Sequence, residues 1–538
     1  MIPRPGLLGR FVLGLAAWGI AAGAFALPPE VVAQIAFGDS DDKLTAIGEL
    51  VGSGDRSALP LLEALLVGEV QTIGADRVLL VKNDAAVDAR SGLAVSPLPE
   101  GREDVIVNNR VRRAVATGIA ALKLAAAERE VRLAAAKELQ HSADEGALPA
   151  IAGALAKESD PEVRGLLALT QASIELASPD RATRIGAVRA LAASDTGATK
   201  TLLTALLERR GAIYTEPDPE IRAEAERSLR AVDQRLLTGE ILARVFTGIS
   251  LGSILLLAAL GLAITYGLMG VINLAHGELI MIGAYATYVV QNLFRLYAPA
   301  AFDLYPIIAL PIAFAASAGV GVLLERTVIC HLYGRPLETL LATWGLSLLL
   351  IQAVRTIFGA QNVQVENPGW MSGGFEIMTN VVLPWSRVVI IGFTVCTVVA
   401  LWLLLARTRL GLFMRAVTQN RAMAGALGVR TPRVDMLAFG LGSGIAGLAG
   451  CALSQIGNVG PDLGQSYIVD SFMVVVLGGV GQLIGTVYAA LGLGLVNKLI
   501  EAWQGAVLAK IAVLVFIIIF IQKRPQGLFA LKGRTVEA

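Results

Sequence analysis

The polar residues of greatest chemical interest lie where two apolar stretches meet, between residues 265 and 285. Asn273, His276 and Glu278 occur close together there, among glycines that permit close helix packing or an interrupted helix. Polar side chains cost free energy inside a bilayer unless they face protein or water. Two interpretations stay open: these groups line a solute path, or they fix a turn near the membrane interface. The candidates for a path are Thr265, Tyr266, Asn273, His276, Glu278, Asp470, Gly478 and Gly479.

The last three of these candidates belong to a second, glycine-rich region. Residues 470–482 are short for a membrane span, and Gly478 and Gly479 indicate a closely packed or broken helix. Asp470 stands at the start of this region, where it either caps the helix or faces an outer vestibule.

A basic segment between two apolar stretches is the candidate for contact with a partner. Residues 410–429 contain no acidic residue, have helical spacing up to Leu427 and stop at Gly428. A short helix with cationic and apolar groups suits docking into a groove of another protein, and a solvated basic loop is the alternative. The predicted contact residues are Arg415, Ala416, Gln419, Asn420, Ala424, Leu427 and Gly428.

Other chemistry is not indicated by the sequence. The chain has three histidines, three cysteines and no CxxC pair, so we expect no metal site. No lysine follows a glycine, so no phosphate-binding loop of the Gly-Lys-Ser/Thr kind exists. Nucleic-acid binding needs concentrated positive charge, whereas the net charge here is +1. We therefore expect no enzyme activity, no cofactor in this chain and no nucleic-acid partner.

The composition places the second half of the chain in a membrane. Of the charged residues, 60 precede Arg244 and only 29 are spread over the 295 residues that follow. A segment so poor in charge predicts a helical membrane domain over 241–530, with eight or nine spans. The apolar stretches are 245–266, 279–296, 306–325, 338–358, 387–406, 434–457, 470–482, 484–500 and 506–522.

The N-terminus predicts which side of the membrane the first half occupies. Residues 1–26 have the pattern of a secretory signal peptide, in which arginines precede an apolar run from Phe11 to Phe25. A retained anchor is the alternative. Cleavage and export would make 27–240 a periplasmic domain, and nine crossings would leave the tail, 531–538, in the cytoplasm. We therefore expect a multi-pass protein of the bacterial inner membrane.

The charges of the loops test this topology independently. The number of crossings places the loops 326–337 and 407–433 inside, and both are rich in arginine. It places 297–305, 359–386 and 458–469 outside, and these loops contain no Lys or Arg. This asymmetry agrees with the positive-inside rule.

Residues 27–240 have the composition of a soluble helical array. Asp160-Pro161-Glu162 recurs as Asp218-Pro219-Glu220, which predicts stacked helix pairs that resemble short HEAT-like repeats. Two apolar runs at 78–81 and 105–107 predict a small β-hairpin insertion. An Ala-rich helical array without a repeat is the alternative.

Several segments of the membrane part resemble a known family. Residues 272–278, the loop from Arg415 to Gly428 and the closing 523–529 are similar to the branched-chain amino-acid type of ABC-importer permease, over roughly 240–530. Residues 458–472 and 509–533 are similar to the urea-transporting subgroup, as is the exported repeat domain. The expected fold class is then all-α: a polytopic helical permease preceded by an exported helical repeat domain.

The resemblance also implies a function and a set of partners. A second permease subunit, two cytoplasmic ATPases that bind the ATP and a periplasmic binding protein would complete an importer, most simply for urea. Residues 410–429 would be its coupling helix, although Arg415-Ala416-Val417 replaces the family's more familiar Glu-Ala-Ala start. Alternatives are a branched-chain amino-acid or short-amide permease, an ion-coupled secondary transporter that uses Glu278, Glu325 or Asp470, and a membrane-anchored interaction protein.

Overall fold

The structure of the chain is a computed structural model. It describes residues 27–74, 77–82, 85–99, 101–142, 144–210, 213–378 and 381–529. The predicted signal peptide and the predicted tail lie outside the described residues. The chain divides into two compact units, Met1–Leu236 and Leu237–Ala538, and the division falls within the long helix α11 (Pro219–Met269).

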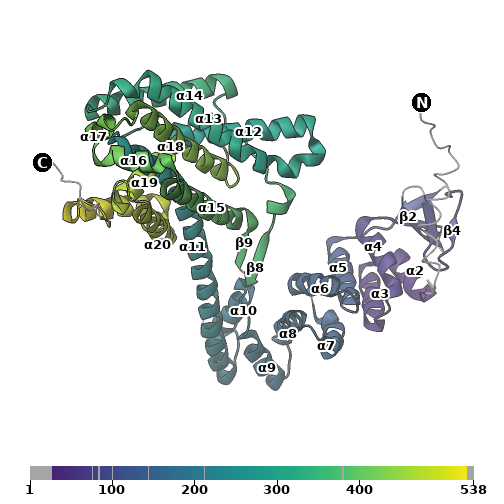
Figure 1. Ribbon diagram of the computed structural model, residues 1–538. Helices are drawn as coiled ribbons and strands as arrows, with labels where there is room; N and C mark the ends of the chain where they lie inside the picture. The colour runs from purple at the N-terminus through teal and green to yellow at the C-terminus, as the bar shows by residue number, and fades with distance from the viewer. Residues whose placement is uncertain are drawn as a thin grey trace, which may run out of the picture. The chain divides into compact units, whose positions relative to one another are not determined.

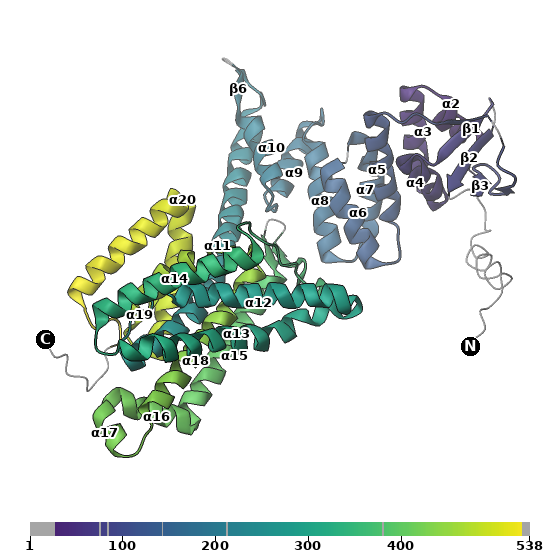
Figure 2. The same cartoon turned by 90° about the horizontal axis from the view of Figure 1, so that it is seen from above.

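The first unit is mainly a stack of short helices (Figure 2). Buried side chains join α5 through α8 in one cluster, and a second cluster joins α8 through the start of α11. The helices are α2 (Pro29–Phe37), α3 (Ser40–Ser53), α4 (Leu59–Val67), α5 (Asn109–Lys123), α6 (Arg129–Ser142), α7 (Leu148–Lys157), α8 (Pro161–Glu175), α9 (Arg181–Leu191) and α10 (Gly197–Leu207).

The recurring Asp-Pro-Glu sequence has the same ionic role in both places. Arg129 at the start of α6 pairs with Asp160, with Nε 2.8 Å from Oδ2, and also with Glu162. Arg181 at the start of α9 pairs in the same way with Asp218 and Glu220. The arginine hydrogen bond holds the pKa of each aspartate below its usual value. The sequence similarity thus corresponds to a repeated contact between alternate helices, α6 with α8 and α9 with α11.

The predicted β-hairpin is too small. The segment forms a five-stranded antiparallel sheet in the order β4-β3-β2-β1-β5. The apolar run at 78–81 lies in β2, whereas the run at 105–107 follows β5 instead of forming a strand. Strands β2 and β5 are not neighbours, because β1 lies between them in the sheet. Short, charged strands such as β5 carry no apolar alternation that would reveal them. The strands are β1 (Val70–Ile73), β2 (Arg77–Lys82), β3 (Ala85–Asp88), β4 (Ala94–Val95) and β5 (Arg102–Asp104).

The second unit is a helical bundle (Figure 1). Seven helices of the described residues are long and apolar enough to cross a membrane, so the all-α class and the multi-pass architecture are confirmed. They and the shorter helices between them are the end of α11, α12 (His276–Tyr297), α13 (Tyr305–Thr327), α14 (Pro336–Phe358), α15 (Trp385–Arg407), α16 (Arg409–Gln419), α17 (Arg421–Ala426), α18 (Thr431–Ser454), α19 (Leu463–Gly478) and α20 (Leu483–Lys523).

The nine predicted apolar stretches all fall on these helices, with two differences in their limits. The stretches 484–500 and 506–522 are the two arms of α20, which is kinked at Gly505, where φ is +82°. The helix predicted at 470–482 instead begins at Leu463 and ends at Gly478. Glycines at 478, 479 and 481 end it early, because the last two have positive φ values.

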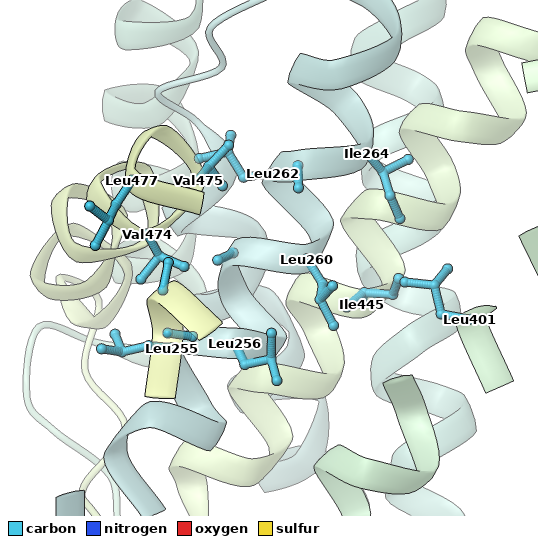
Figure 3. Close-up of a cluster of buried hydrophobic side chains, with 14 of the residues drawn as sticks. Leu255, Leu256, Leu260, Leu262, Ile264, Leu401, Ile445, Val474, Val475 and Leu477 are labelled. Carbon is cyan, nitrogen blue, oxygen red and sulfur yellow. The ribbon is translucent and has the colours of Figure 1, made fainter. Parts of the chain in front are cut away.

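The apolar part of α11 and helix α18 are the most buried elements of the bundle, whereas α15 and α20 are largely exposed. Figure 3 shows leucines of α11 between Val474 and Leu477 of α19 on one side and Ile445 of α18 and Leu401 of α15 on the other. Helix α18 also packs along α12 and α13. The other, more exposed helices therefore pack around α11 and α18.

The loops gather in two groups, one at each end of the bundle. The backbones of Val363 and Val459 exchange two hydrogen bonds of 2.8 Å, and the Gly369 amide donates to Asp303 over 2.7 Å. These contacts join the three loops that were predicted to lie outside. The hairpin of β8 (Gly374–Met378) and β9 (Val381–Pro384) belongs to the same group. The two arginine-rich loops meet at the other end, where Arg421 lies over the ring of Tyr333.

Candidate functional site

The basic segment after α15 forms two helices instead of the single helix that was predicted. Helix α16 ends at Gln419, and Asn420 adopts an extended conformation. The Asn420 side chain then accepts a hydrogen bond of 2.8 Å from the Met423 amide and caps α17. An Asn inside a helical pattern is the signal that could have revealed this break, because Asn favours caps over helix interiors.

One face of α16 and α17 is anchored in the bundle. Met414, Val417 and Ala424 are buried in the cluster around α11, and Arg415 donates to the Leu405 carbonyl at the end of α15 over 2.7 Å. Ala424 is only 3% exposed, so its side chain packs against the bundle, and its predicted partner contact stays a prediction. Ala416 is half-buried.

The opposite face is exposed and carries both apolar and cationic groups. Leu427 is 79% exposed, and Leu412, Phe413 and Met423 are also exposed. Of the predicted contact residues, Arg415, Gln419, Asn420, Leu427 and Gly428 are exposed. We call Leu412, Phe413, Met423 and Leu427 the docking face. Beside this segment lies a cavity of about 640 Å³ between α11, α15, α16 and the start of α20.

Three of the path candidates lie together at the α11–α12 junction, and all three are buried. The side-chain oxygen Oδ1 of Asn273 accepts from the Ala275 amide over 3.0 Å, and His276 Nε2 lies 3.0 Å from the Ala258 carbonyl oxygen. Glu278 Oε1 accepts from Ser347 Oγ over 2.7 Å. Asn273 thus fixes the turn, while His276 joins α12 to α11 and Glu278 joins α12 to α14.

The second polar atom of each of these residues has no hydrogen-bond partner. These atoms are Asn273 Nδ2, His276 Nδ1 and Glu278 Oε2. Buried polar groups without a partner are rare in proteins and point to strain, to water or to a bound group. The arrangement is therefore suited to contact with a polar solute, as well as to fixing the turn. Both interpretations of the sequence have a structural basis here.

Thr265 and Tyr266 offer less to a solute. The Thr265 hydroxyl donates to the Leu262 carbonyl over 3.1 Å within its own helix. The ring of Tyr266 lies 6.3 Å from that of Phe472, so it packs between α11 and α19.

Asp470, Gly478 and Gly479 have structural contacts. Asp470 lies within α19 instead of capping it, and its Oδ2 is 3.6 Å from Lys510 Nζ on α20. A β-carbon at Gly478 would lie 2.6 Å from the backbone of Gly485, and one at Gly479 would collide with the segment after α20. These glycines therefore let α19, α20 and residues 526–529 pack closely. Their small size is what this packing requires, and their place on a path stays a prediction.

Two residues near the docking face escaped the sequence analysis. Asp435 at the start of α18 is fully buried and is paired with Arg421, and Tyr333 donates to Glu325 over 2.9 Å. A single acid just after a long basic segment was the available signal for Asp435. No pattern indicated Tyr333, because its partners come from distant parts of the sequence.

The bundle and its polar junction define a multi-pass membrane protein of the transport class. The family model described as branched-chain amino acid transport system / permease component matches residues 244–522, and the chain belongs to this family. The family is one of transport permeases. The first unit precedes the matched region.

Named relatives agree with this assignment. The high-affinity branched-chain amino acid permease BraD of Pseudomonas aeruginosa is 31% identical over 261 residues, which are 47% of this chain and 84% of that protein. LivH of Escherichia coli K12 is 28% identical over 292 residues, 53% of this chain and 94% of that protein. The ribose import permease RbsC of the same strain is 31% identical over 106 residues, 18% and 33% of the two chains. No solved structure matches significantly.

Proposed function

We propose that this chain is a permease subunit of an ATP-binding-cassette importer for urea. A second homologous permease subunit, two cytoplasmic ATPases and a periplasmic binding protein complete the importer, and the ATPases bind the ATP. Family membership over residues 244–522 is the observation that carries the transport role. The docking face supports the ATPase contact, because exposed leucine, phenylalanine and methionine beside arginines suit a protein groove.

We further propose that the first unit is periplasmic and that the docking face is cytoplasmic. The two groups of loops separate as an exported N-terminus requires, and one group contains the arginine-rich segments 326–337 and 407–433. The same orientation puts the docking face where ATPases would meet it. In this proposal the first unit is a HEAT-like helical repeat domain, which the repeated arginine–acid contacts support.

The junction of Asn273, His276 and Glu278 is the proposed start of the solute path. Urea offers four N–H donors and one carbonyl acceptor, and it is neutral. An unpaired amide nitrogen, ring nitrogen and carboxylate oxygen provide complementary donors and acceptors. A branched-chain amino acid is the second candidate, because the relatives carry that name and because an unpaired carboxylate oxygen also suits an ammonium group. The large N-terminal unit outside the matched region favours the urea subgroup.

Radiolabelled uptake tests the substrate directly. In a deletion strain that expresses the whole importer, we expect urea uptake that excess acetamide or leucine reduces by less than half. The measurement is initial uptake rate at limiting urea. Leucine as the preferred solute would overturn the urea assignment and leave the transport class intact. Uptake that continues without the ATPases would contradict the coupled mechanism and favour an ion-coupled transporter.

Glu278→Gln is expected to lower the initial uptake rate by about 10-fold or more. The substitution keeps the shape of the side chain but replaces one oxygen acceptor with an NH₂ donor, and a lost buried hydrogen bond costs about 1–3 kcal/mol. Uptake and the amount of assembled complex are both measured. Glu338→Gln, at an exposed acid that starts α14, is the matched control and should leave uptake unchanged. Wild-type uptake by Glu278→Gln would remove this residue from the path.

A further inference from the structure

An ionic cluster whose two acids are buried and whose arginine is partly exposed connects the docking segment to the bundle. Arg421, the first residue of α17, binds Asp435 of α18 through both terminal nitrogens, and one of these contacts is 3.2 Å. The Arg421 guanidinium lies 5.1 Å from the centre of the Tyr333 ring, and the Tyr333 hydroxyl donates to Glu325 Oε1 over 2.9 Å. We call Arg421, Asp435, Tyr333 and Glu325 the joint cluster. It links four segments: α17, α18, the loop after α13, and α13 itself.

Helix α17 has few other attachments. It contains six residues, which is too short for a helix to be stable alone. Ala424 is its one buried side chain. The helix is bounded by the extended residue Asn420 and by Gly428, whose φ is +87°. Arg421–Asp435 is therefore the principal directional contact between α17 and α18.

The chemistry of the contact is poorly explained by stability alone. Burying an ion pair costs desolvation energy, and an apolar pair of similar volume often stabilises a protein as well or better. Asp435 is fully buried and Glu325 is 1% exposed, whereas the Arg421 side chain is 43% exposed, so the desolvation cost falls mainly on the acids. A bidentate pair, however, fixes both the distance and the direction between two elements, which an apolar contact does not. This property suits an element that must transmit a displacement.

Displacement of α18 would reach the proposed path. Two turns beyond Asp435, Gly442 packs against α11. A β-carbon added at Gly442 would lie 2.6 Å from the Gly261 carbonyl oxygen. A β-carbon at Gly261 would in turn lie 2.8 Å from the ring of His276. Movement of α18 along its axis therefore changes the space around a path residue through two close contacts.

We propose that the joint cluster transmits movement of α16 and α17 to α13 and α18, so that Arg421 and Asp435 are positioning residues for coupling. This inference rests on the proposed function, since it takes the docking face as the ATPase contact. The four residues touch neither ATP nor solute in this scheme. They set how far a push on α17 moves the central helices.

The test uses the complete importer in lipid nanodiscs and vesicles, and it compares two readouts. The first is solute imported per ATP hydrolysed. The second is the nucleotide-dependent change in hydrogen exchange of residues 436–442, which is independent of the identity of the solute. For Arg421→Gln and Asp435→Asn we expect an assembled complex and retained ATP hydrolysis. The import ratio should fall by about fivefold or more, as for a typical coupling energy, and the exchange response should be lost.

Rescue and control variants separate coupling from folding. The double variant R421Q/D435N restores a neutral hydrogen-bonded pair and should recover part of the import ratio. Tyr333→Phe keeps the ring under the guanidinium and removes the hydroxyl, with its bond to Glu325 and a weaker one of 3.3 Å to Met269 Sδ. It should lower the ratio without changing assembly. Arg335→Gln breaks the exposed pair with Glu338 in the same region and should change nothing.

The outcomes distinguish this inference from the proposed function. Wild-type ratios and exchange responses in both single variants and in Tyr333→Phe would overturn the joint cluster as the transmitter. If the single variants fail to assemble, an unchanged Tyr333→Phe also overturns it. A wild-type complex that shows the exchange response but imports no urea would contradict the substrate assignment alone.

Discussion

Gly283→Ala is expected to destabilise the membrane bundle, although it adds only one methyl group. Gly283 of α12 faces Gly447 of α18, and a β-carbon at Gly283 would collide with the Gly447 backbone. A side chain can rotate away, but two packed helices must separate, so the cost is at the upper end of the ~1–3 kcal/mol typical of overpacking or beyond it. We expect an apparent melting temperature lower by about 5 °C or more, measured by fluorescence-detected size-exclusion chromatography after heating.

Gly392→Ala is the matched control. Gly392 lies within α15, another apolar helix, and a β-carbon there would meet no atom within 4 Å. Because alanine favours helix over glycine by about 0.5–1 kcal/mol, this variant should be unchanged or slightly more stable. Equal melting of the two variants would show that close approach of α12 and α18 does not limit the stability of the bundle.

This contact illustrates which parts of the fold the sequence could predict. The glycines at 277 and 283 indicated close packing, and that prediction is local because it depends only on the size of each residue. Their partners, Gly464 and Gly447, could not be identified, because the register between distant helices depends on the whole bundle. Span positions were predictable for the same local reason, since a long apolar run is sufficient evidence for a membrane helix.

The candidate site shows the same division between local and long-range information. The exposed residues Arg415 and Leu427 followed from a basic segment with helical spacing, and Asn273 and Glu278 followed from polar groups beside apolar runs. The joint cluster could not be predicted from the sequence, because Tyr333 and Asp435 lie about a hundred positions apart. Asp470 was misplaced for a different reason: the glycines after it suggested a later helix, whereas polar residues from Leu463 onward are helical.

Leu427→Glu is expected to separate the ATPases from the permease. Leu427 is the most exposed member of the docking face, and it stands just before the turn at Gly428. An apolar anchor in the centre of an interface contributes about 2 kcal/mol or more, which is roughly 30-fold in Kd. A carboxylate in its place must also be desolvated without a partner, which adds to the loss. Co-purification of the ATPase subunits with the tagged permease should fall by at least about 10-fold, and solute uptake should fall with it.

A second exposed leucine separates this effect from a general effect of added charge. Leu93 is 68% exposed in the first unit, and Leu93→Glu introduces the same group at a site that the proposal places in the periplasm. The amount of ATPase that co-purifies with the Leu93→Glu permease should equal that of the wild type. Both variants should have wild-type melting temperatures, because neither leucine is in a core. Stoichiometric ATPase in the Leu427→Glu complex would contradict the docking face. If only Leu93→Glu lost the co-purifying ATPases, the partner contact would belong to the N-terminal unit, and the proposed orientation of the chain would be reversed.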